Sequence, residues 1–205
     1  MIKRAFDIVV AAIGLLVLSP LMLAVALLIK IDSPGPVLFR QERVGKDFRR
    51  FHIYKFRTMV REAPQSGALI TAGADARITR VGSFLRQTKF DELSQLINVV
   101  KGEMSLVGPR PEVPRYVEMF RKDYEEILRV RPGITDTASL KYQDEGEILG
   151  RGGNPEEDYV RRILPDKVQL AKEYVGRSSF FYDLGLIART LPKLFGFKAR
   201  SSHQS

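Results

Sequence analysis

A long apolar run near the start of the chain constrains its fold more than any other feature. Residues 8–29 form 22 positions without a charged side chain, and as a helix they match the roughly 30 Å hydrocarbon thickness of a bilayer. Ser19 and Pro20 lie in the middle of this run. A proline there removes a backbone hydrogen bond and kinks or breaks the helix. Basic residues flank both ends of the run: Lys3 and Arg4 before it, and Lys30, Arg40 and Arg43 after it.

The charges on both flanks favour a re-entrant helix over a membrane-spanning one. Basic flanks prefer the cytoplasmic side of a membrane, so a helix that enters and returns at Ser19-Pro20 satisfies both ends. A single-pass anchor is the main alternative. A cleaved signal peptide fits less well, because its apolar region is usually about 7 to 15 residues long. We predict a helix-break-helix membrane element at residues 1–32, a membrane-associated cytosolic domain at 33–200 and a tail at 201–205.

Composition narrows the chemistry open to that domain. The 33 Lys and Arg against 24 Asp and Glu give a net charge of +9, which predicts an anionic partner such as a phosphorylated substrate or acidic lipids. Nucleic acid is disfavoured, because the basic residues are scattered among acidic ones and no reader motif is present. With no cysteine and only His52 and His203, thiol nucleophiles and Cys- or His-based metal clusters are excluded. Metal ions with oxygen ligands remain open.

The local patterns predict a mostly helical α/β fold with a small β-hairpin or sheet. Residues 37–41 and 51–56 are expected to form a hairpin around the turn at Gly45-Lys46-Asp47. Residues 61–80 are expected to form a loop. Helices are predicted over 84–100, 114–130, 155–175 with a restart at Pro165, and 180–195. The last of these either packs in the core or rests at a membrane interface.

An acidic pair in the predicted helix 84–100 is the strongest candidate for chemistry. Asp91, Gln95 and Asn98 follow at i, i+4 and i+7, on a face expected to point away from the packed side. The neighbouring carboxylates Asp91 and Glu92 suit a nucleophile or metal ligand beside an acid, base or orienting group. The alternative is a capping box formed by Thr88 and Asp91, with acidic residues placed in the first turn of a helix.

A proline-bracketed arginine follows the acidic pair. In Gly108-Pro109-Arg110-Pro111 the prolines fix an extended, non-helical backbone, so Arg110 projects from a stiff segment. A guanidinium held in this way beside carboxylates suits phosphate recognition, because its planar fork can bind two phosphate oxygens. A proline-rich helix terminator with a surface arginine is the alternative.

Several separated motifs together carry a family resemblance. The run KFDELSQLINVVKGEMSLVGPRPEVP at 89–114, with YKFRTM at 54–59 and RPGIT at 131–135, looks like the bacterial sugar transferase family, the small monotopic phosphoglycosyl transferases. The motifs occur in the family's order, and the match extends from the apolar run to about residue 190. The family's re-entrant helix, broken at a Ser-Pro pair, agrees with the expectation for Ser19 and Pro20.

The resemblance implies an activity and a set of partners. Members of this family transfer a sugar-1-phosphate from a UDP-sugar to polyprenyl (undecaprenyl) phosphate at the cytosolic face of the bacterial inner membrane, an early step in glycoconjugate or exopolysaccharide biosynthesis. The sugar and the oligomeric state are left open, with a homodimer among the options. A membrane-anchored scaffold without enzymatic activity is the alternative from the residues alone.

The resemblance also implies roles for particular residues. Asp91 is expected to be the nucleophile of a ping-pong reaction and a ligand of Mg²⁺, and Glu92 to orient the site or manage the proton of the incoming phosphate. Lys55, Arg86 and Arg110 are expected to bind substrate phosphate.

One segment departs from the family pattern. Where many members resemble GITGWAQVNGR, residues 133–143 read GITDTASLKYQ, so Gln143 stands in place of the expected phosphate-binding arginine. Lys141 is a candidate to substitute for it. Alternatively, the acidic run at 144–147 recognises sugar hydroxyls.

Overall fold

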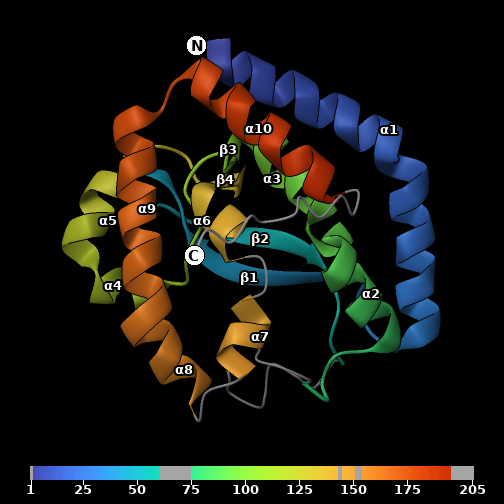
Figure 1. The fold of residues 1–205 in the computed structure, drawn as a ribbon. Helices are drawn as coiled ribbons and strands as arrows, with labels where there is room; N and C mark the ends of the chain where they lie inside the picture. The colour runs from blue at the N-terminus through green and yellow to red at the C-terminus, as the bar shows by residue number, and fades with distance from the viewer. Residues whose placement is uncertain (1, 61–74, 143–144, 151–153, 195–205) are drawn as a thin grey trace, which may run out of the picture.

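The computed structural model describes residues 2–60, 75–142, 145–150 and 154–194, in which helices lie around two small central sheets (Figure 1). The predicted tail at 201–205 and most of the predicted loop at 61–80 lie outside these residues. In chain order the principal elements are α1 (Ile2–Asp32), β1 (Leu38–Val44), β2 (Arg50–Phe56), α2 (Arg80–Thr88), a 3₁₀ helix (Phe90–Gln95), α3 (Leu96–Lys101), β3 (Ser105–Val107), α4 (Pro114–Met119), α5 (Arg121–Ile127), β4 (Gly133–Thr135), α6 (Thr137–Lys141), α7 (Glu145–Gly150), α8 (Pro155–Asp158), a π-helical turn (Tyr159–Ile163), α9 (Leu164–Arg177) and α10 (Phe180–Leu194).

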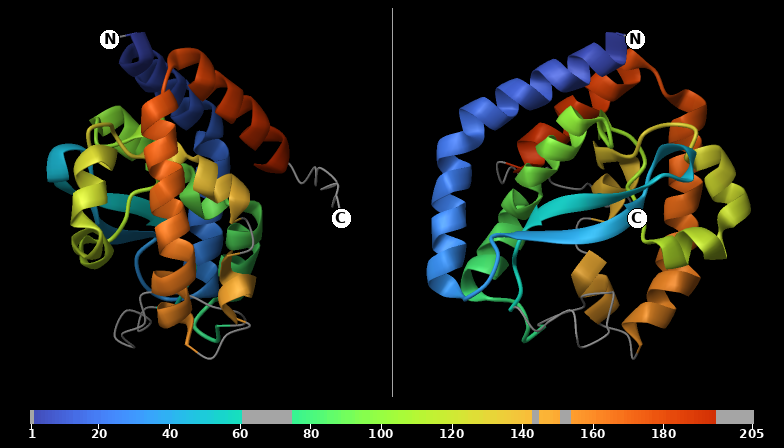
Figure 2. Two further views of the ribbon diagram at one scale, coloured as in Figure 1. Left: turned by 60° about the vertical axis from the view of Figure 1, so that its left-hand side comes forward. Right: turned by 180° about the vertical axis from the view of Figure 1, so that it is seen from behind.

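The apolar run forms one continuous helix, α1, so the interruption predicted at Ser19 and Pro20 is not seen. The helix bends about midway along its length instead (Figures 1 and 2). Pro20 has no N–H to offer the carbonyl of Leu16, and the Ser19 hydroxyl donates to that carbonyl at 2.7 Å. Because the remaining backbone hydrogen bonds persist and the orphaned carbonyl has a partner, the proline bends the helix without ending it.

Both ends of α1 contact the rest of the fold. Near its start, Arg4 donates to the carbonyls of Val99 and Met104. Near its end, Val25 and Ile29 are buried in a cluster formed with the hairpin and α2. Between these contacts much of α1 is exposed, and it is the one described helix long and apolar enough to cross a membrane.

The predicted hairpin is confirmed. β1 and β2 pair antiparallel with Gln41 opposite Ile53, and a 3₁₀ turn at Lys46–Phe48 joins them. Phe51 and Ile53 are buried while His52 between them is exposed, which is the alternation that the sequence predicts for a strand packed on one face.

The single helix predicted over 84–100 is wrong. α2 ends at Thr88, Lys89 adopts a left-handed conformation with φ of 59°, and the 3₁₀ helix and α3 follow. The polar face expected to point away from the core is buried, with Asn98 wholly inaccessible. Asn98 accepts from the Tyr54 N–H at 3.0 Å and donates to the His52 carbonyl at 2.8 Å. Contacts to the hairpin edge thus override the apolar periodicity that predicted one helix.

Two other predicted helices are also divided. The 114–130 segment forms α4 and α5, because Phe120 leaves the helical region at φ −118° and ψ 35° and packs against the core. The 155–175 segment forms α8, the π-helical turn and α9. Pro165 directly follows the π-helical turn, and Asp158, Ile163 and Leu164 all keep right-handed helical dihedrals, so the chain is not interrupted before Pro165.

A parallel strand pair that the sequence did not predict brings two motifs together. β3 pairs with β4, with Ser105 opposite Gly133 and Val107 opposite Thr135. A Cβ atom on Gly133 would lie 2.0 Å from the backbone nitrogen of Gly108, so only glycine fits at this crossing. The close approach of these backbones joins the loop containing Arg110 to the RPGIT segment.

We predict that Gly133→Ala destabilises the protein at the contact between β3 and β4. The added methyl group forces the strands apart, and overpacking of this kind typically costs about 1–3 kcal/mol. Thermal unfolding followed by circular dichroism in detergent should show a lower Tm. Gly176→Ala is the matched control, because a Cβ on Gly176 meets nothing within 4 Å and alanine suits a helix better than glycine. Equal Tm values for the two variants would contradict the prediction.

Candidate active site

The Glu92 carboxylate lies between two cations. Its Oε1 atom is 2.8 Å from Lys55 Nζ and 2.6 Å from Arg110 Nη2, and Arg110 Nη1 lies 3.4 Å from Oε2. Lys55 comes from β2, Glu92 from the 3₁₀ helix and Arg110 from the loop between β3 and α4. The structure therefore brings together three predicted site residues from separate motifs, and it confirms that a non-helical segment presents Arg110 beside a carboxylate.

The charges around Glu92 keep it ionised. Burial alone would raise the pKa of Glu92, but Arg110 and Lys55 outweigh this effect and hold the pKa well below its usual range. In turn Glu92 raises the pKa of the Arg110 guanidinium. Burial lowers the pKa of Lys55, and the charge of Glu92 opposes that shift. The three groups form an ion cluster with two positive charges and one negative charge.

Asp91 is in a different environment from its neighbour. Only 8% of the residue is exposed, and its Oδ1 atom has no hydrogen-bond partner among the described residues. Burial raises the pKa of Asp91, the charge of Lys55 opposes this, and the charge of Glu92 adds to it. Two adjacent carboxyl groups whose pKa values are pushed in opposite directions suit two different chemical roles.

The capping box predicted as the alternative for Asp91 is not formed, although Asp91 and Glu92 do lie in the first turn of the 3₁₀ helix. The Thr88 hydroxyl donates back into α2, to the carbonyls of Phe84 and Leu85, and the 3₁₀ helix that contains Asp91 begins after Lys89 without a side-chain cap. The carboxylate of Asp91 is thus buried without a capping function.

Arg86 completes the positive side of the site. Its Nε atom donates to Thr58 Oγ1 at 2.8 Å, and its charge acts on the Asp91 carboxyl group. A Cβ on Gly82 would lie 2.0 Å from the Thr58 carbonyl oxygen, so a glycine in the first turn of α2 lets this helix approach the end of the YKFRTM segment. Thr58 was missed by the sequence analysis, although it lies inside that motif.

Lys141 is in an ion pair away from this cluster. It lies 2.8 Å from Asp166 Oδ2 of α9, with about half of its side chain exposed. Gln143 and Asp144 lie outside the described residues. Asp136 and Ser139, which also differ from the family pattern, are the residues of this segment that lie beside Arg110.

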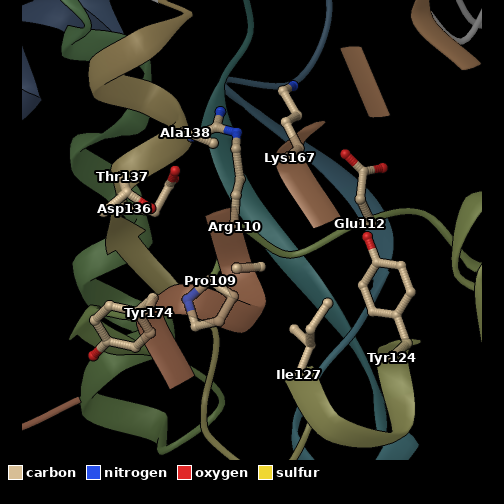
Figure 3. A pocket seen from close by; sticks show the side chains of 11 residues that line it. Pro109, Arg110, Glu112, Tyr124, Ile127, Asp136, Thr137, Ala138, Lys167 and Tyr174 are labelled. Carbon is tan, nitrogen blue, oxygen red and sulfur yellow. The ribbon is translucent and has the colours of Figure 1, made fainter. Parts of the chain in front are cut away.

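Asp136 and Ser139 form a second, unpredicted polar group beside Arg110. Asp136 caps α6 by accepting from the backbone N–H and the hydroxyl of Ser139, both at 2.6 Å. The Ser139 hydroxyl lies 3.5 Å from Arg110 Nη1. Arg110 and Asp136 also line a small cavity together with Glu112 and Lys167 (Figure 3). The spacing Asp-x-x-Ser is a capping signal that could have found this group.

The carboxylates suit a hard metal ion that shares its ligands with a substrate. The described residues contain no group of three or more His, Cys, Asp or Glu side chains able to hold a metal ion. Mg²⁺ is commonly bound by one or two carboxylates together with substrate phosphates and water. The unpartnered Oδ1 of Asp91 fits that mode, whereas Glu92 is already held by Lys55 and Arg110.

The fold thus combines a long apolar helix with a buried carboxyl group, Asp91, that lies in the field of Lys55 and Arg86. The sequence model of the bacterial sugar transferase family matches residues 1–196, and the chain belongs to that family.

Curated relatives support the same assignment. The chain is 46% identical over 197 residues to the exopolysaccharide production protein PSS of Rhizobium leguminosarum bv. phaseoli, and this match covers 93% of each chain. It is 40% identical to UDP-N-acetylgalactosamine-undecaprenyl-phosphate N-acetylgalactosaminephosphotransferase of Aeromonas hydrophila, covering 97% of this chain and 45% of that protein. It is 37% identical to UDP-glucose:undecaprenyl-phosphate glucose-1-phosphate transferase of Escherichia coli, covering 97% of this chain and 41% of that protein. The chain thus spans less than half the length of the latter two relatives.

We predict that Asp91→Asn stabilises the substrate-free protein. Because burial raises the pKa of Asp91, the protonated form favours folding, and this contribution is lost as pH rises through the folded-state pKa. Removing the charge should therefore raise the Tm at pH 8, by roughly 2–4 °C for about 1 kcal/mol in a chain of this size. The gain in Tm should shrink as the pH is lowered towards the usual pKa of a carboxyl group.

Differential scanning fluorimetry at several pH values measures this effect. The control is Asp123→Asn, which removes a carboxylate from a partly exposed ion pair with Lys172 and should not raise the Tm. A lower Tm for Asp91→Asn at pH 8 would show that the ionised Asp91 is held by favourable contacts.

Proposed function

We propose that the chain is a phosphoglycosyl transferase that moves a sugar-1-phosphate from a UDP-sugar to polyprenyl (undecaprenyl) phosphate. The observation that carries this proposal is Asp91, a buried carboxyl group with one unpartnered oxygen that is followed in the chain by Glu92, which holds Lys55 and Arg110. The family match supports it, as do relatives whose names specify UDP-sugars and undecaprenyl phosphate. The name of the Rhizobium relative points to exopolysaccharide biosynthesis as the pathway class.

The proposed reaction has two displacements at one phosphorus atom. Asp91 Oδ1 attacks the β-phosphorus of the UDP-sugar, an aspartyl O–P bond forms, and the bond to the bridging oxygen breaks so that UMP leaves with the electron pair. A phosphate oxygen of the polyprenyl phosphate then attacks the same phosphorus and displaces the Asp91 carboxylate. The covalent step avoids a direct reaction between two dianions, and the kinetics are ping-pong.

The cations act on the charge that develops at phosphorus. Arg110, Lys55 and Arg86 would bind the equatorial phosphate oxygens, and fixed cations in a site shielded from water stabilise such charge strongly. Glu92 orients the site, because it holds Lys55 and Arg110 beside Asp91 before substrate arrives. Arg110 is the donor best suited to two phosphate oxygens at once.

Asp91, together with the substrate diphosphate, would hold Mg²⁺. The ion supplies charge neutralisation for the diphosphate and for the departing UMP when it is bound.

The contacts of α1 support a monotopic arrangement at the cytosolic face of the inner membrane. Lys3, Arg4 and Asp7 bind the region around β3, and Arg57 donates to the carbonyls of Ser33 and Pro34 just after α1 ends. Because both ends are attached to the same cytosolic domain, α1 would enter and leave on one side. Leu16, Leu23 and Ile31 are each more than 70% exposed and would contact lipid.

This placement suits a lipid-linked acceptor. The phosphate of polyprenyl phosphate lies at headgroup level, and the net charge of +9 favours an anionic membrane surface. The site would therefore meet its acceptor without lifting the polyprenyl chain out of the bilayer.

We predict that UMP release requires Asp91. Purified protein in detergent, mixed with Mg²⁺, polyprenyl phosphate and each of several UDP-sugars, should release UMP with at least one donor. Asp91→Asn should lower the rate by about 10³-fold or more, as expected for loss of a nucleophile, and EDTA should stop release until Mg²⁺ is added back. Asp123→Asn is the control, because Asp123 lies in α5 in an ion pair with Lys172.

A scaffold without enzymatic activity predicts the opposite result. No UMP release with any donor, or equal release by wild type and Asp91→Asn, would contradict the proposed function.

A further inference from the structure

A buried polar network holds the strand that leads into the Arg110 loop. The carbonyl of Val107, the last residue of β3, accepts a hydrogen bond from Lys3 Nζ at 3.1 Å. Lys3 also donates to Asp183 Oδ2, and the Tyr174 hydroxyl donates to Asp183 Oδ1 at 2.7 Å and lies 3.2 Å from the Val107 carbonyl. Side chains from α1 and α9 thus meet at one backbone group of β3, and Asp183 of α10 accepts from both of them.

Three members of the network are inside the protein, whereas the Lys3 side chain is 38% exposed. Val107 is 1% exposed, Tyr174 is 3% exposed and Asp183 is 4% exposed. A carboxylate in such a place requires its partners, because an unpaired buried charge is strongly unfavourable. Asp183 therefore fixes Lys3 and Tyr174 together, and the position of Lys3 fixes the carbonyl of Val107.

The backbone beyond Val107 transmits this position to Arg110. The Gly108 N–H donates to the Thr135 carbonyl at 3.1 Å, and the Gly133 N–H donates to the Pro109 carbonyl at 2.9 Å. Pro109 and Pro111 restrict the φ angles on either side of Arg110. With few rotations left between Val107 and Arg110, a shift of the Val107 carbonyl moves the guanidinium relative to Glu92 and Asp91.

Resting on the proposed function, in which Arg110 binds substrate phosphate, we propose that Tyr174 and Asp183 are positioning residues for Arg110. Neither residue contacts Asp91, Glu92 or Lys55 in the described contacts. They act through Lys3 and Val107, and so link the first turn of the membrane helix α1 to the phosphate-binding arginine. Loss of the link should misplace the guanidinium while the protein still folds.

The test is a double-mutant cycle in kcat/KM for UMP release, measured with a radiolabelled donor so that slow variants can be followed. Tyr174→Phe and Asp183→Asn should each lower kcat/KM by roughly 10-fold to 100-fold, the range expected when a catalytic group is displaced by about 1 Å. In an Arg110→Ala background both substitutions should have little further effect, because the group they position is gone. Thermal unfolding should show the same Tm change in either background.

Tyr182→Phe is the matched control. Tyr182 packs against Tyr174, with ring centroids 6.0 Å apart, and no hydrogen bond of its hydroxyl to a described residue is seen. Loss of the Tyr182 hydroxyl should leave kcat/KM unchanged. Lys3→Arg, which keeps a cation beside Asp183, should retain more activity than Lys3→Met.

The outcomes separate the inference from the proposed function. If Tyr174→Phe lowers kcat/KM by the same factor with and without Arg110, or not at all, the positioning role is wrong even though Arg110→Ala impairs the reaction. If Arg110→Ala leaves kcat/KM unchanged, the phosphate-binding role of Arg110 fails and this inference fails with it.

Discussion

The contact of the Glu92 carboxylate with Lys55 and Arg110 is the interaction on which the arrangement of the site depends. It ties together β2, the 3₁₀ helix and the loop after β3, three segments distant in the sequence. The three side chains are partly buried, with 17–31% of each exposed, so removing one partner would leave a charge in a partly desolvated place. Asp91 is left adjacent to the cations but without a hydrogen bond to Oδ1, and a carboxylate oxygen in that state is available for attack or for a metal ion.

The long apolar helix α1 is integrated into this arrangement. The start of α1 binds β3 through Lys3 and Asp7, and its far end packs against the hairpin and α2. The strand and helix that carry Lys55 and Arg86, and the strand that precedes the Arg110 loop, therefore all contact a helix whose outer surface is apolar. In the proposed reaction, the nucleophile must lie at the depth of a lipid-linked phosphate, and the contacts of α1 would hold it there.

The sequence predicted the features that depend on local rules. Alternation predicted the hairpin, the prolines predicted a non-helical backbone at Arg110, and the adjacent acids predicted a site at Asp91 and Glu92. It did not predict the break at Lys89, nor that the polar face would be buried, because that burial depends on Asn98 bonding to β2. Nor did it predict the β3–β4 pair, whose strands are three residues each and meet at a glycine contact with no periodic signal. Non-local contacts of this kind cannot be derived from spacing along the chain.

The most direct test of the covalent mechanism is the intact mass of the protein after incubation with Mg²⁺ and a panel of UDP-sugars in the absence of lipid acceptor. The account predicts a mass gain of one phosphosugar in the wild-type protein with at least one donor and no gain in Asp91→Asn. The donor that gives the adduct would also identify the sugar. An adduct of the same mass in Asp91→Asn, or turnover with acceptor but no adduct at any time point, would contradict the account.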